Sequence, residues 1–492
     1  MSLKSQLIKY MDAGYPMIYI NTFEELKTDR IIKSVMGGRE GLEWNGAKGF
    51  VDFKTKTPNI EDASLLKTLR MLNSDEELDR KFLVLKDITS QLDDSEVVAT
   101  LKSIALSIIN GLDTFVIIVA SRTKIPLELE KFITILELEY PDQNEIKEKI
   151  NSFLNEQGAT MSAELMEEMS MAFKGLTEFE IENLLSSALA NDGLFTREDL
   201  ELIFEQKQQM IMKSGILEMI PVKEKVEDIG GLENLKKWVY RKSKVYRSIN
   251  KAVEFGVDMP KGMLIAGVPG CGKSHTAKVT AKLFEVPLLR LDMGKIMGKY
   301  VGESEENMQR AIKLAEAISP CILWIDELEK AFAGISGSGS EVTVRLFGAF
   351  LTWMQEKKSP AFVVATANDI TKLPPELLRK GRFDEIFYVG LPKPEERRKI
   401  AEIHIRKRRK ADLSGIDLQK IVDKTNGYSG ADIEGVIIDA VENAYSDDKD
   451  KLTTEYVINA IDNTHSLSEI MKDSLDKLSK EYENRKFKNA SA

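Results

Sequence analysis

The chain has 492 residues, of which 43% are hydrophobic and 30% are charged, as in folded globular proteins. Its formal net charge of −10 argues against a protein whose main task is to coat nucleic acid or an anionic membrane. The two cysteines, Cys271 and Cys321, exclude a disulfide framework and fit a reducing compartment. The sequence has no apolar run near the roughly 18 residues of a membrane-spanning helix, and no basic-then-apolar signal peptide. A soluble intracellular protein is therefore expected.

Short apolar runs alternate with longer amphipathic stretches, which is typical of α/β proteins with parallel strands. In the first part, strands are expected at residues 17–20, 82–85 and 115–119, followed by helices from about 144 to 215. In the second part, which begins near residue 226, strands are expected at residues 263–265, 288–291, 322–325 and 362–365. The chain is predicted to be helical from Pro394 onward, and the charged stretch 473–492 is predicted to fray.

The two parts follow one plan. Residues 175–182 echo residues 427–434, and residues 141–150 echo residues 392–400. Two helical tails could share helix-start residues by chance. The order of the segments and their position after the last strand of each part also match, which favours duplication.

Residues 267–274 fit the phosphate-binding pattern G-x-x-x-x-G-K-[ST] in full, between an expected strand and an expected helix. Glycines let backbone N–H groups turn toward phosphate oxygens, and the helix N-terminus adds partial positive charge. Lys273 is expected to reach the β- and γ-phosphates and Ser274 to ligate Mg²⁺. A chance glycine-rich turn is the alternative, which this context disfavours. The residues expected to bind nucleotide here are Gly267, Pro269, Gly270, Cys271, Gly272, Lys273, Ser274 and His275.

The expected strand at residues 322–325 ends in two carboxylates, Asp326 and Glu327. Because adjacent strand residues point to opposite sides, the two carboxylates are expected to have different tasks. Asp326 is expected to hold Mg²⁺ and Glu327 to polarise the attacking water. A strand that simply ends in solvated acids is the alternative, and the P-loop upstream disfavours it.

Three further polar residues follow the next expected strand. Asn368 is expected to help place the water near the γ-phosphate. Arginines stabilise charge on a transferring phosphoryl group and can be supplied by a neighbouring subunit, which makes Arg379 and Arg382 candidates. Taken singly, each arginine would be interpreted as a surface ion-pair residue, and its position in the series gives it weight.

These elements, in this order and spacing, resemble the AAA+ ATPases, and residues 226–463 resemble the AAA proteins proper. The resemblance implies that Asn368 is the sensor 1 residue and that Arg379 and Arg382 are arginine fingers acting in trans. It implies an adenine pocket opened by Asp228, Ile229 and Gly230, a ribose contact from His404, and a lid motif with Gly430 and Ala431 beside the adenine.

The resemblance also implies two pore loops, at residues 298–304 and 334–340. In the first, Lys299, Tyr300 and Val301 are expected to contact the substrate, because an aromatic ring on a glycine-flanked loop can grip an extended polypeptide. A loop tyrosine that packs against its own domain is the alternative for Tyr300.

The whole chain closely resembles a family of AAA ATPases first noted as hypothetical chloroplast reading frames and found also in cyanobacteria and other bacteria. Residues 320–332 and 350–354 carry this likeness. In that family the N-terminal half is similar to an ATPase domain that has lost its catalytic parts. Here Glu24 and Glu25 follow the first strand where a P-loop would lie, and they would repel phosphate. The first half is therefore predicted not to hydrolyse ATP.

The predicted fold is an α/β P-loop AAA+ domain, with a parallel sheet flanked by helices and a helical lid, preceded by a degenerate AAA-like α/β domain. The expected boundaries are 1–215 for the degenerate domain (lid-like helices at about 141–215), 216–393 for the large ATPase subdomain and 394–492 for the lid and C-terminal tail. Several AAA subgroups carry Asp-Gly where residues 355–357 read Gln-Glu-Lys, so communication between subunits is expected to differ. Three histidines in no His-Glu-x-x-His pattern exclude a fused zinc protease.

The expected activity is Mg²⁺-dependent ATP hydrolysis with one active P-loop per chain, and the expected cofactors are ATP and Mg²⁺. Trans-acting arginines imply a homo-oligomer, which the resemblance makes a hexamer, acting on a protein substrate or adaptor in the cytoplasm, or in the chloroplast stroma for a plastid-encoded protein. No membrane partner is expected.

Three functions are compared. A ring that remodels or threads a protein substrate fits the motifs best. A nucleotide-dependent switch or scaffold that binds partners without threading is the alternative. Nucleic-acid remodelling is weaker, because the basic run 406–410 suits a helix C-terminus and has no interleaved aromatic residues.

Overall fold

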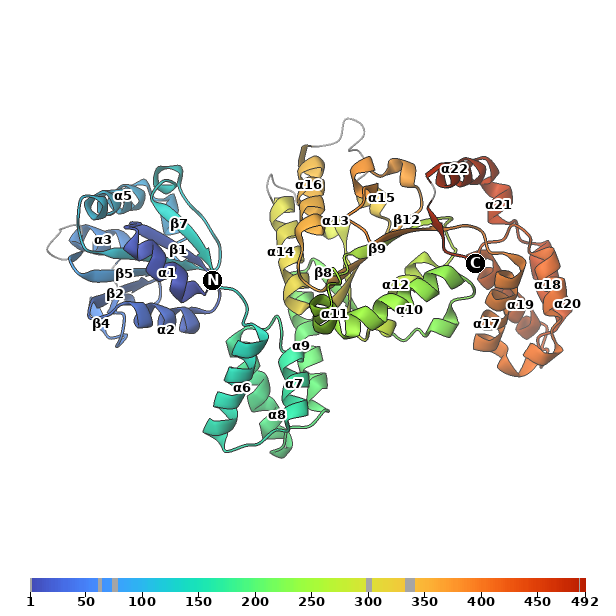
Figure 1. Ribbon diagram of the computed structural model, residues 1–492, viewed down its shortest axis with the longest axis horizontal. Coiled ribbons are helices and arrows are strands. Elements are labelled where there is room, and N and C mark those ends of the chain that lie inside the picture. The colour runs from blue at the N-terminus through green and yellow to red at the C-terminus, as the bar shows by residue number, and fades with distance from the viewer. Residues whose placement is uncertain (1, 61–63, 73–77, 298–302, 332–340, 486) are drawn as a thin grey trace. The chain divides into compact units, whose positions relative to one another are not determined.

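The computed structural model describes residues 2–60, 64–72, 78–297, 303–331, 341–485 and 487–492. These residues form two compact units, Met1–Phe195 and Thr196–Ala492. Each unit contains a seven-stranded sheet with helices on both faces and a further group of helices (Figure 1). Among the described helices, none combines the length and apolar character needed to cross a bilayer.

The sheet of the first unit has the strand order β4-β3-β2-β5-β6-β1-β7. Strands β2, β5, β6, β1 and β7 pair in parallel, and β3 and β4 are added by antiparallel pairing at one edge. The strand bounds are β1 (Met17–Asn21), β2 (Glu40–Asn45), β3 (Gly49–Asp52), β4 (Pro58–Ile60), β5 (Lys81–Lys86), β6 (Phe115–Ala120) and β7 (Ile133–Glu137). The three strands expected in this part are confirmed.

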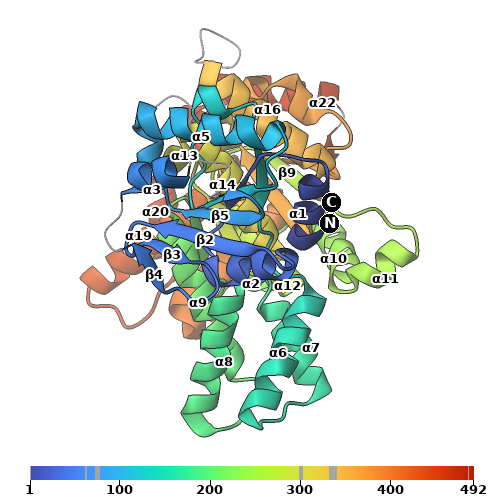
Figure 2. The same ribbon diagram turned by 90° about the vertical axis from the view of Figure 1, so that its left-hand side faces the viewer.

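Alternate side chains of β1 enter two different cores, as the two-residue period of a strand requires. Met17 and Tyr19 pack with α3 and α5 on one face, whereas Ile18 and Ile20 pack with α1 and α2 on the other (Figure 2). The helix bounds are α1 (Leu3–Asp12), α2 (Glu25–Val35), α3 (Leu65–Leu72), η1 (Gln91–Asp93), α5 (Ser95–Ile109), η2 (Leu127–Leu129), α6 (Gln143–Gln157), α7 (Ala163–Ala172) and α8 (Glu178–Asp192).

The sheet of the second unit has the order β14-β13-β9-β12-β11-β10-β8, and only β8 at its edge pairs antiparallel among the described strands. The bounds are β8 (Leu217–Ile220), β9 (Gly262–Gly267), β10 (Leu288–Leu291), β11 (Cys321–Ile325), β12 (Ala361–Ala367), β13 (Glu385–Val389) and β14 (Lys488–Asn489). Every residue of β9, β11 and β12 is buried, because helices cover both faces of a parallel sheet. The four strands expected here are confirmed.

Three cores hold the second unit together. Helices α10 and α12 cover one face of the sheet, α14 and α16 cover the other, and α17 to α20 enclose a core of their own. The helices before β12 are α9 (Asp199–Ser214), η3 (Val226–Asp228), α10 (Glu233–Arg247), α11 (Ile249–Glu254), α12 (Lys273–Phe284), α13 (Met293–Ile296), α14 (Glu303–Ile318), α15 (Leu328–Ala331) and α16 (Glu341–Glu356). Those after it are η4 (Ile370–Lys372), η5 (Pro375–Leu378), α17 (Pro394–Arg409), η6 (Lys410–Gly415), α18 (Leu418–Lys424), α19 (Gly430–Ser446), α20 (Thr454–Asp462), α21 (Leu467–Ile470) and α22 (Lys472–Arg485).

The C-terminal stretch does not fray, contrary to the sequence-based prediction. Tyr482 of α22 is buried and stacks on Tyr388 with ring centroids 4.2 Å apart. Strand β14 then pairs with β13, and the carbonyl of Ala490 accepts hydrogen bonds from the first N–H groups of α10, those of Asn234 and Leu235 (3.0 and 3.1 Å). Few apolar residues make these contacts, so the charged composition of the stretch concealed them.

The two units divide between Phe195 and Thr196, which lies before the residue 215 boundary expected from the sequence. Helix α9 accounts for the difference, because its Ile211 is fully buried in the same hydrophobic core as residues of α14 and α16. The helix therefore belongs to the second compact unit in space.

Candidate nucleotide site

The P-loop connects the buried strand β9 to α12. Gly267 has φ 143°, and a Cβ atom there would lie 2.0 Å from the carbonyl oxygen of Val389. Gly272 is the N-cap of α12 with φ 84°, in the left-handed region that a side chain disfavours. These two glycines let the loop leave the strand closely packed and turn directly into the helix.

Lys273 is the first residue of α12 and is only 6% exposed. Its Nζ donates hydrogen bonds to the carbonyl oxygens of Gly267 (2.8 Å) and Val268 (2.7 Å) in its own loop. Burial lowers the pKa of Lys273 to about 8, against the opposing effect of nearby acidic groups. The ammonium is thus held next to the place where phosphate groups are expected.

Asp326 lies directly after β11 and joins two hydroxyl groups. Its Oδ1 accepts hydrogen bonds from Ser274 (3.2 Å) and from Thr366 (2.5 Å). The Thr366 Oγ1 in turn accepts from the backbone N–H of Glu327 at 3.0 Å. The hydroxyl of Ser274 and the carboxylate of Asp326 are the hard oxygen donors that Mg²⁺ prefers, so this pair fits the expected metal.

Glu327 has a left-handed backbone, with φ 52°. Its Oε1 accepts a hydrogen bond from Nδ2 of Asn368 at 3.2 Å, which joins the expected base to the expected sensor. The backbone N–H of Asn368 donates to Glu329 at 3.0 Å, and the Glu329 side chain is 5% exposed.

Residues of η3, α17 and the start of α19 line the side of the cavity that is expected to bind adenine. The backbone N–H of Ala431 donates to the carbonyl oxygen of Gly270 at 2.9 Å, so the lid motif touches the P-loop. His404 lies 3.3 Å from Glu434, and burial lowers the His404 pKa below its usual value despite that carboxylate. Burial also raises the pKa of the Cys271 thiol to about 11, which disfavours a thiolate redox switch in the loop.

These residues line one cavity of about 410 Å³. The sequence-predicted residues that line it are Asp228, Ile229, Gly230, Pro269, Gly270, Cys271, Gly272, Lys273, Ser274, His275, Asp326, Glu327, Asn368, His404, Gly430 and Ala431. Thr366, Ile400 and Glu434 also line it and were not expected. Thr366 lies two residues before Asn368, so the two side chains point to the same side of the strand. This spacing is the signal that could have identified Thr366.

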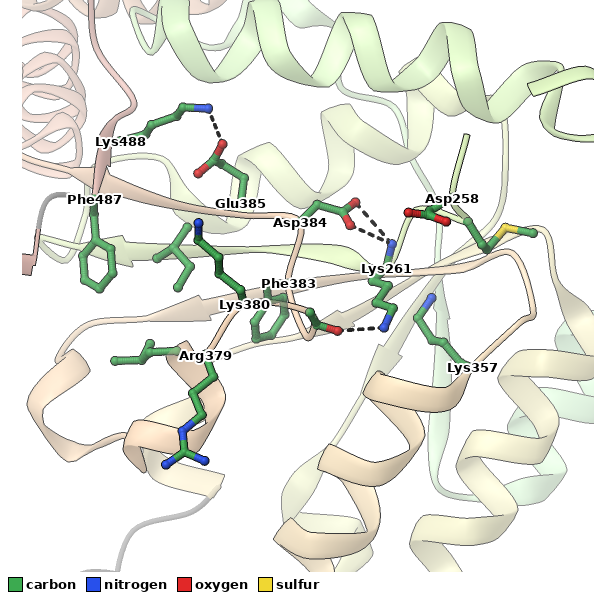
Figure 3. A pocket seen from close by; sticks show the side chains of 14 residues that line it. Asp258, Lys261, Lys357, Arg379, Lys380, Phe383, Asp384, Glu385, Phe487 and Lys488 are labelled. Carbon is green, nitrogen blue, oxygen red and sulfur yellow. Dashed lines mark hydrogen bonds and ion pairs between the residues drawn. The ribbon is translucent and has the colours of Figure 1, made fainter. Parts of the chain in front are cut away.

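The two candidate arginine fingers lie elsewhere, on the loop between β12 and β13. Arg379 is exposed and lines a second cavity of about 740 Å³ together with Lys261, Lys380 and Phe487 (Figure 3). Arg382 is half-buried, and its guanidinium donates to the carbonyl oxygen of Glu376 in its own loop. Neither arginine lines the nucleotide cavity of its own chain. The pore-loop residues Lys299, Tyr300 and Val301, and the second loop at 334–340, lie outside the described residues.

Family profiles match successive parts of the chain. The profile of the ATPase family associated with various cellular activities (AAA) matches residues 263–391, and that of the AAA+ lid domain matches residues 415–458. The N-terminal and second domains of SpoVK-like AAA ATPases match residues 3–138 and 144–214. Together, the fold and these matches define an AAA ATPase with its lid, preceded by two SpoVK-like domains.

Individual relatives show to which family of AAA ATPases the chain belongs. The uncharacterized AAA domain-containing protein ycf46 of Guillardia theta is 40% identical over 458 residues, which cover 92% of this chain and 89% of the relative. Its counterpart in Pyropia yezoensis is 37% identical over 466 residues and 93% of each chain. The chain therefore belongs to the ycf46 family of AAA domain-containing proteins. The cell division cycle protein 48 homolog of Archaeoglobus fulgidus is 30% identical over 312 residues, covering 61% of this chain and 41% of that protein.

Proposed function

We propose that the second unit hydrolyses ATP with Mg²⁺, as a member of a homo-oligomer, a hexamer by family resemblance. The observation that carries this proposal is the convergence of Lys273, Ser274, Asp326, Glu327 and Asn368 on one cavity. These residues come from the start of α12 and from the ends of β11 and β12. They supply a cation, metal ligands, a base and an amide within one site.

Each residue has a distinct role in the proposed reaction. Lys273 would exchange its loop carbonyls for phosphate oxygens, and Ser274 and Asp326 would hold Mg²⁺, which neutralises phosphate charge. Glu327 would accept a proton from the attacking water, and Asn368 would hold both the water and the base in place.

The placement of Arg379 supports a shared site. This exposed arginine lies outside the nucleotide cavity of its own chain, so it could act only on the nucleotide of a neighbouring copy. Arg382 is also proposed to serve there, held by its own loop. ATP-driven change at such an interface would be coupled to remodelling or threading of a protein through Lys299, Tyr300 and Val301.

A nucleotide-dependent switch that binds partners is the second candidate, and it shares the same site. Nucleic-acid remodelling is disfavoured, because three arginines of the basic run 406–410 are paired with carboxylates. Arg406 pairs with Glu402, Arg408 with Glu434 (2.8 Å) and Arg409 with Asp412 (2.6 Å).

The test compares phosphate release by the wild type, Glu327→Gln and Glu285→Gln, whose carboxylate is exposed and lies outside the nucleotide cavity. Glu327→Gln is expected to lower kcat by about 10²–10⁴-fold while ATP still binds, because only the base is removed. The control is expected to retain wild-type activity. Undiminished hydrolysis by Glu327→Gln would refute the proposed role of this residue.

A further inference from the structure

The sheet registers align the two units residue by residue. In the first unit, Tyr19 of β1 pairs with Ile118, which pairs with Leu85 of β5. In the second unit, Leu264 of β9 pairs with Ala365, which pairs with Ile325 of β11. When Tyr19 is matched to Leu264, Lys86 falls in the place of Asp326 and Asp87 in the place of Glu327. The backbone agrees, because Asp87 has φ 51° and Glu327 has φ 52°.

The charges at the corresponding positions are exchanged between the two units. Helix α12 begins with Lys273, which faces the carboxylate side of its site, whereas α2 begins with Glu25. Glu25 lies 3.0 Å from Nζ of Lys86. The Lys86 side chain is 7% exposed and also contacts Asp29 at 3.0 Å and Glu43 at 3.7 Å. An ammonium group thus occupies the position at which the second unit carries its proposed metal ligand, and it would repel a divalent cation.

The loop before α2 is shorter than the P-loop, and its Glu24 side chain bonds to α8. Three residues, 22–24, connect β1 to α2, whereas five, 268–272, connect β9 to α12. The Glu24 carboxylate accepts a hydrogen bond from the backbone N–H of Glu178, the first residue of α8, at 2.8 Å. A negative group at this position satisfies a free N–H and the positive end of α8.

Further ion pairs hold the same helix start. The Glu178 carboxylate lies 3.0 Å from Lys27 and 2.7 Å from Arg30, both on α2. By the sequence echo, Glu178 corresponds to Gly430 of the lid motif, which immediately precedes Ala431, the residue that donates to the P-loop carbonyl of Gly270. In the second unit, a backbone hydrogen bond from Ala431 to Gly270 joins the lid to the P-loop, whereas in the first unit side chains connect the start of α2 to α8.

We propose that the first unit is held closed by its own side chains: Glu24, Lys27 and Arg30 join the start of α2 to Glu178 of α8, and Lys86 stands where the second unit carries its proposed metal ligand. Helix α8 is then held against the start of α2 without a ligand. The first unit stays in this state while the second unit binds and hydrolyses ATP, and it acts as a rigid, nucleotide-independent body.

Hydrogen–deuterium exchange of the full chain tests this proposal. With and without Mg-ATP, wild-type peptides covering residues 143–192 are expected to exchange identically, whereas peptides covering residues 262–285 become protected. The second result shows independently that nucleotide has bound, and Lys273→Ala should abolish it without altering the first unit. Protection of residues 143–192 by Mg-ATP would overturn the proposal.

Variants of the residues that contact Glu178 provide a second test of the proposal. Glu24→Ala removes the acceptor for the Glu178 N–H and is expected to raise exchange at residues 177–182 by about tenfold or more. Glu24→Gln, which keeps an acceptor oxygen, should have a smaller effect, and the exposed Glu148→Ala on α6 should have none. Should Glu24→Ala perturb folding, Lys27→Met with Arg30→Met removes the ion pairs and retains the helix. Unchanged exchange in both Glu24→Ala and the double variant would overturn the proposal.

Discussion

At the scale of single residues, the buried Lys273 is expected to make ATP binding depend on pH. Its pKa is lowered to about 8, and phosphate favours its charged form, so binding must take up a proton once the free lysine has lost one. The ATP Kd is therefore expected to be constant below pH 7 and to weaken about tenfold for each pH unit well above 8. Titrations from pH 6.5 to 9.5 measure this slope.

Two substitutions identify the group that titrates. Lys273→Met should weaken binding overall and remove the slope. Lys357 also has its pKa lowered by burial to about 8, but it lines the second cavity, so Lys357→Met should keep the slope. A slope that survives Lys273→Met would assign the titration to another group.

Glu329 is expected to position Asn368 without touching nucleotide. One of its oxygens holds the Asn368 N–H at 3.0 Å, and the other is buried without a hydrogen-bond partner among the described atoms. Glu329→Ala should lower kcat by about tenfold to a hundredfold and leave the KM for ATP nearly unchanged, because only the sensor amide is released. Glu329→Gln keeps an acceptor and should recover most activity in steady-state phosphate-release assays. Equal loss in both variants would point to a role for the charge itself.

Single residues also show where sequence analysis succeeded and where it did not. The glycines, Lys273 and the carboxylates were predictable, because phosphate binding depends on residues close together in the chain. Thr366 and Glu329 were missed, because each acts through a partner about 40 positions away: Asp326 and Asn368.

At the scale of elements, β14 is expected to contribute to the stability of the second unit. Ala490 is fully buried, and its carbonyl caps α10. Ala490→Arg forces a long cation into this position against the positive end of a helix, and should lower the Tm by about 5 °C or more. Lys488→Ala, at an exposed position of β14 itself, should change the Tm by about 1 °C at most.

Differential scanning fluorimetry reports this comparison directly, since Trp238, Trp324 and Trp353 all lie in the second unit. Equal melting temperatures for the two variants would show that β14 rests on the sheet without stabilising it. The strand was missed because two residues of exposed lysine and asparagine have no strand pattern of their own. Its pairing comes from β13.

At the scale of the whole molecule, the placement of Arg379 predicts complementation between inactive chains. Lys273→Ala lacks a working P-loop but retains its arginine, and Arg379→Ala has the reverse defect. Each alone should be inactive. When the two variants are mixed in equal amounts and assemble in random order, about a quarter of the sites should combine an intact P-loop with an intact arginine. The activity should then recover to roughly a quarter of the wild-type activity.

The mass of particles formed by Glu327→Gln with saturating Mg-ATP checks the assembly on which this mixing depends. A mass of about six chains is expected from the family resemblance. A monomer or dimer at all concentrations, with no recovery of activity on mixing, would favour the switch over the ring.

By itself, the sequence determined the candidate nucleotide-binding residues of the second unit, the central strands of both sheets and the family, because these depend on local spacing and on continuous apolar runs. Tertiary structure alone decided which residues brace the base and sensor, where the arginines lie, and that β14 completes the second sheet. It also decided that the first unit carries an exchanged ion pair where the second carries its proposed metal ligand. These features depend on strand register and on contacts between residues far apart in the chain. Local sequence does not encode such distances, since they exist only after the sheet has formed.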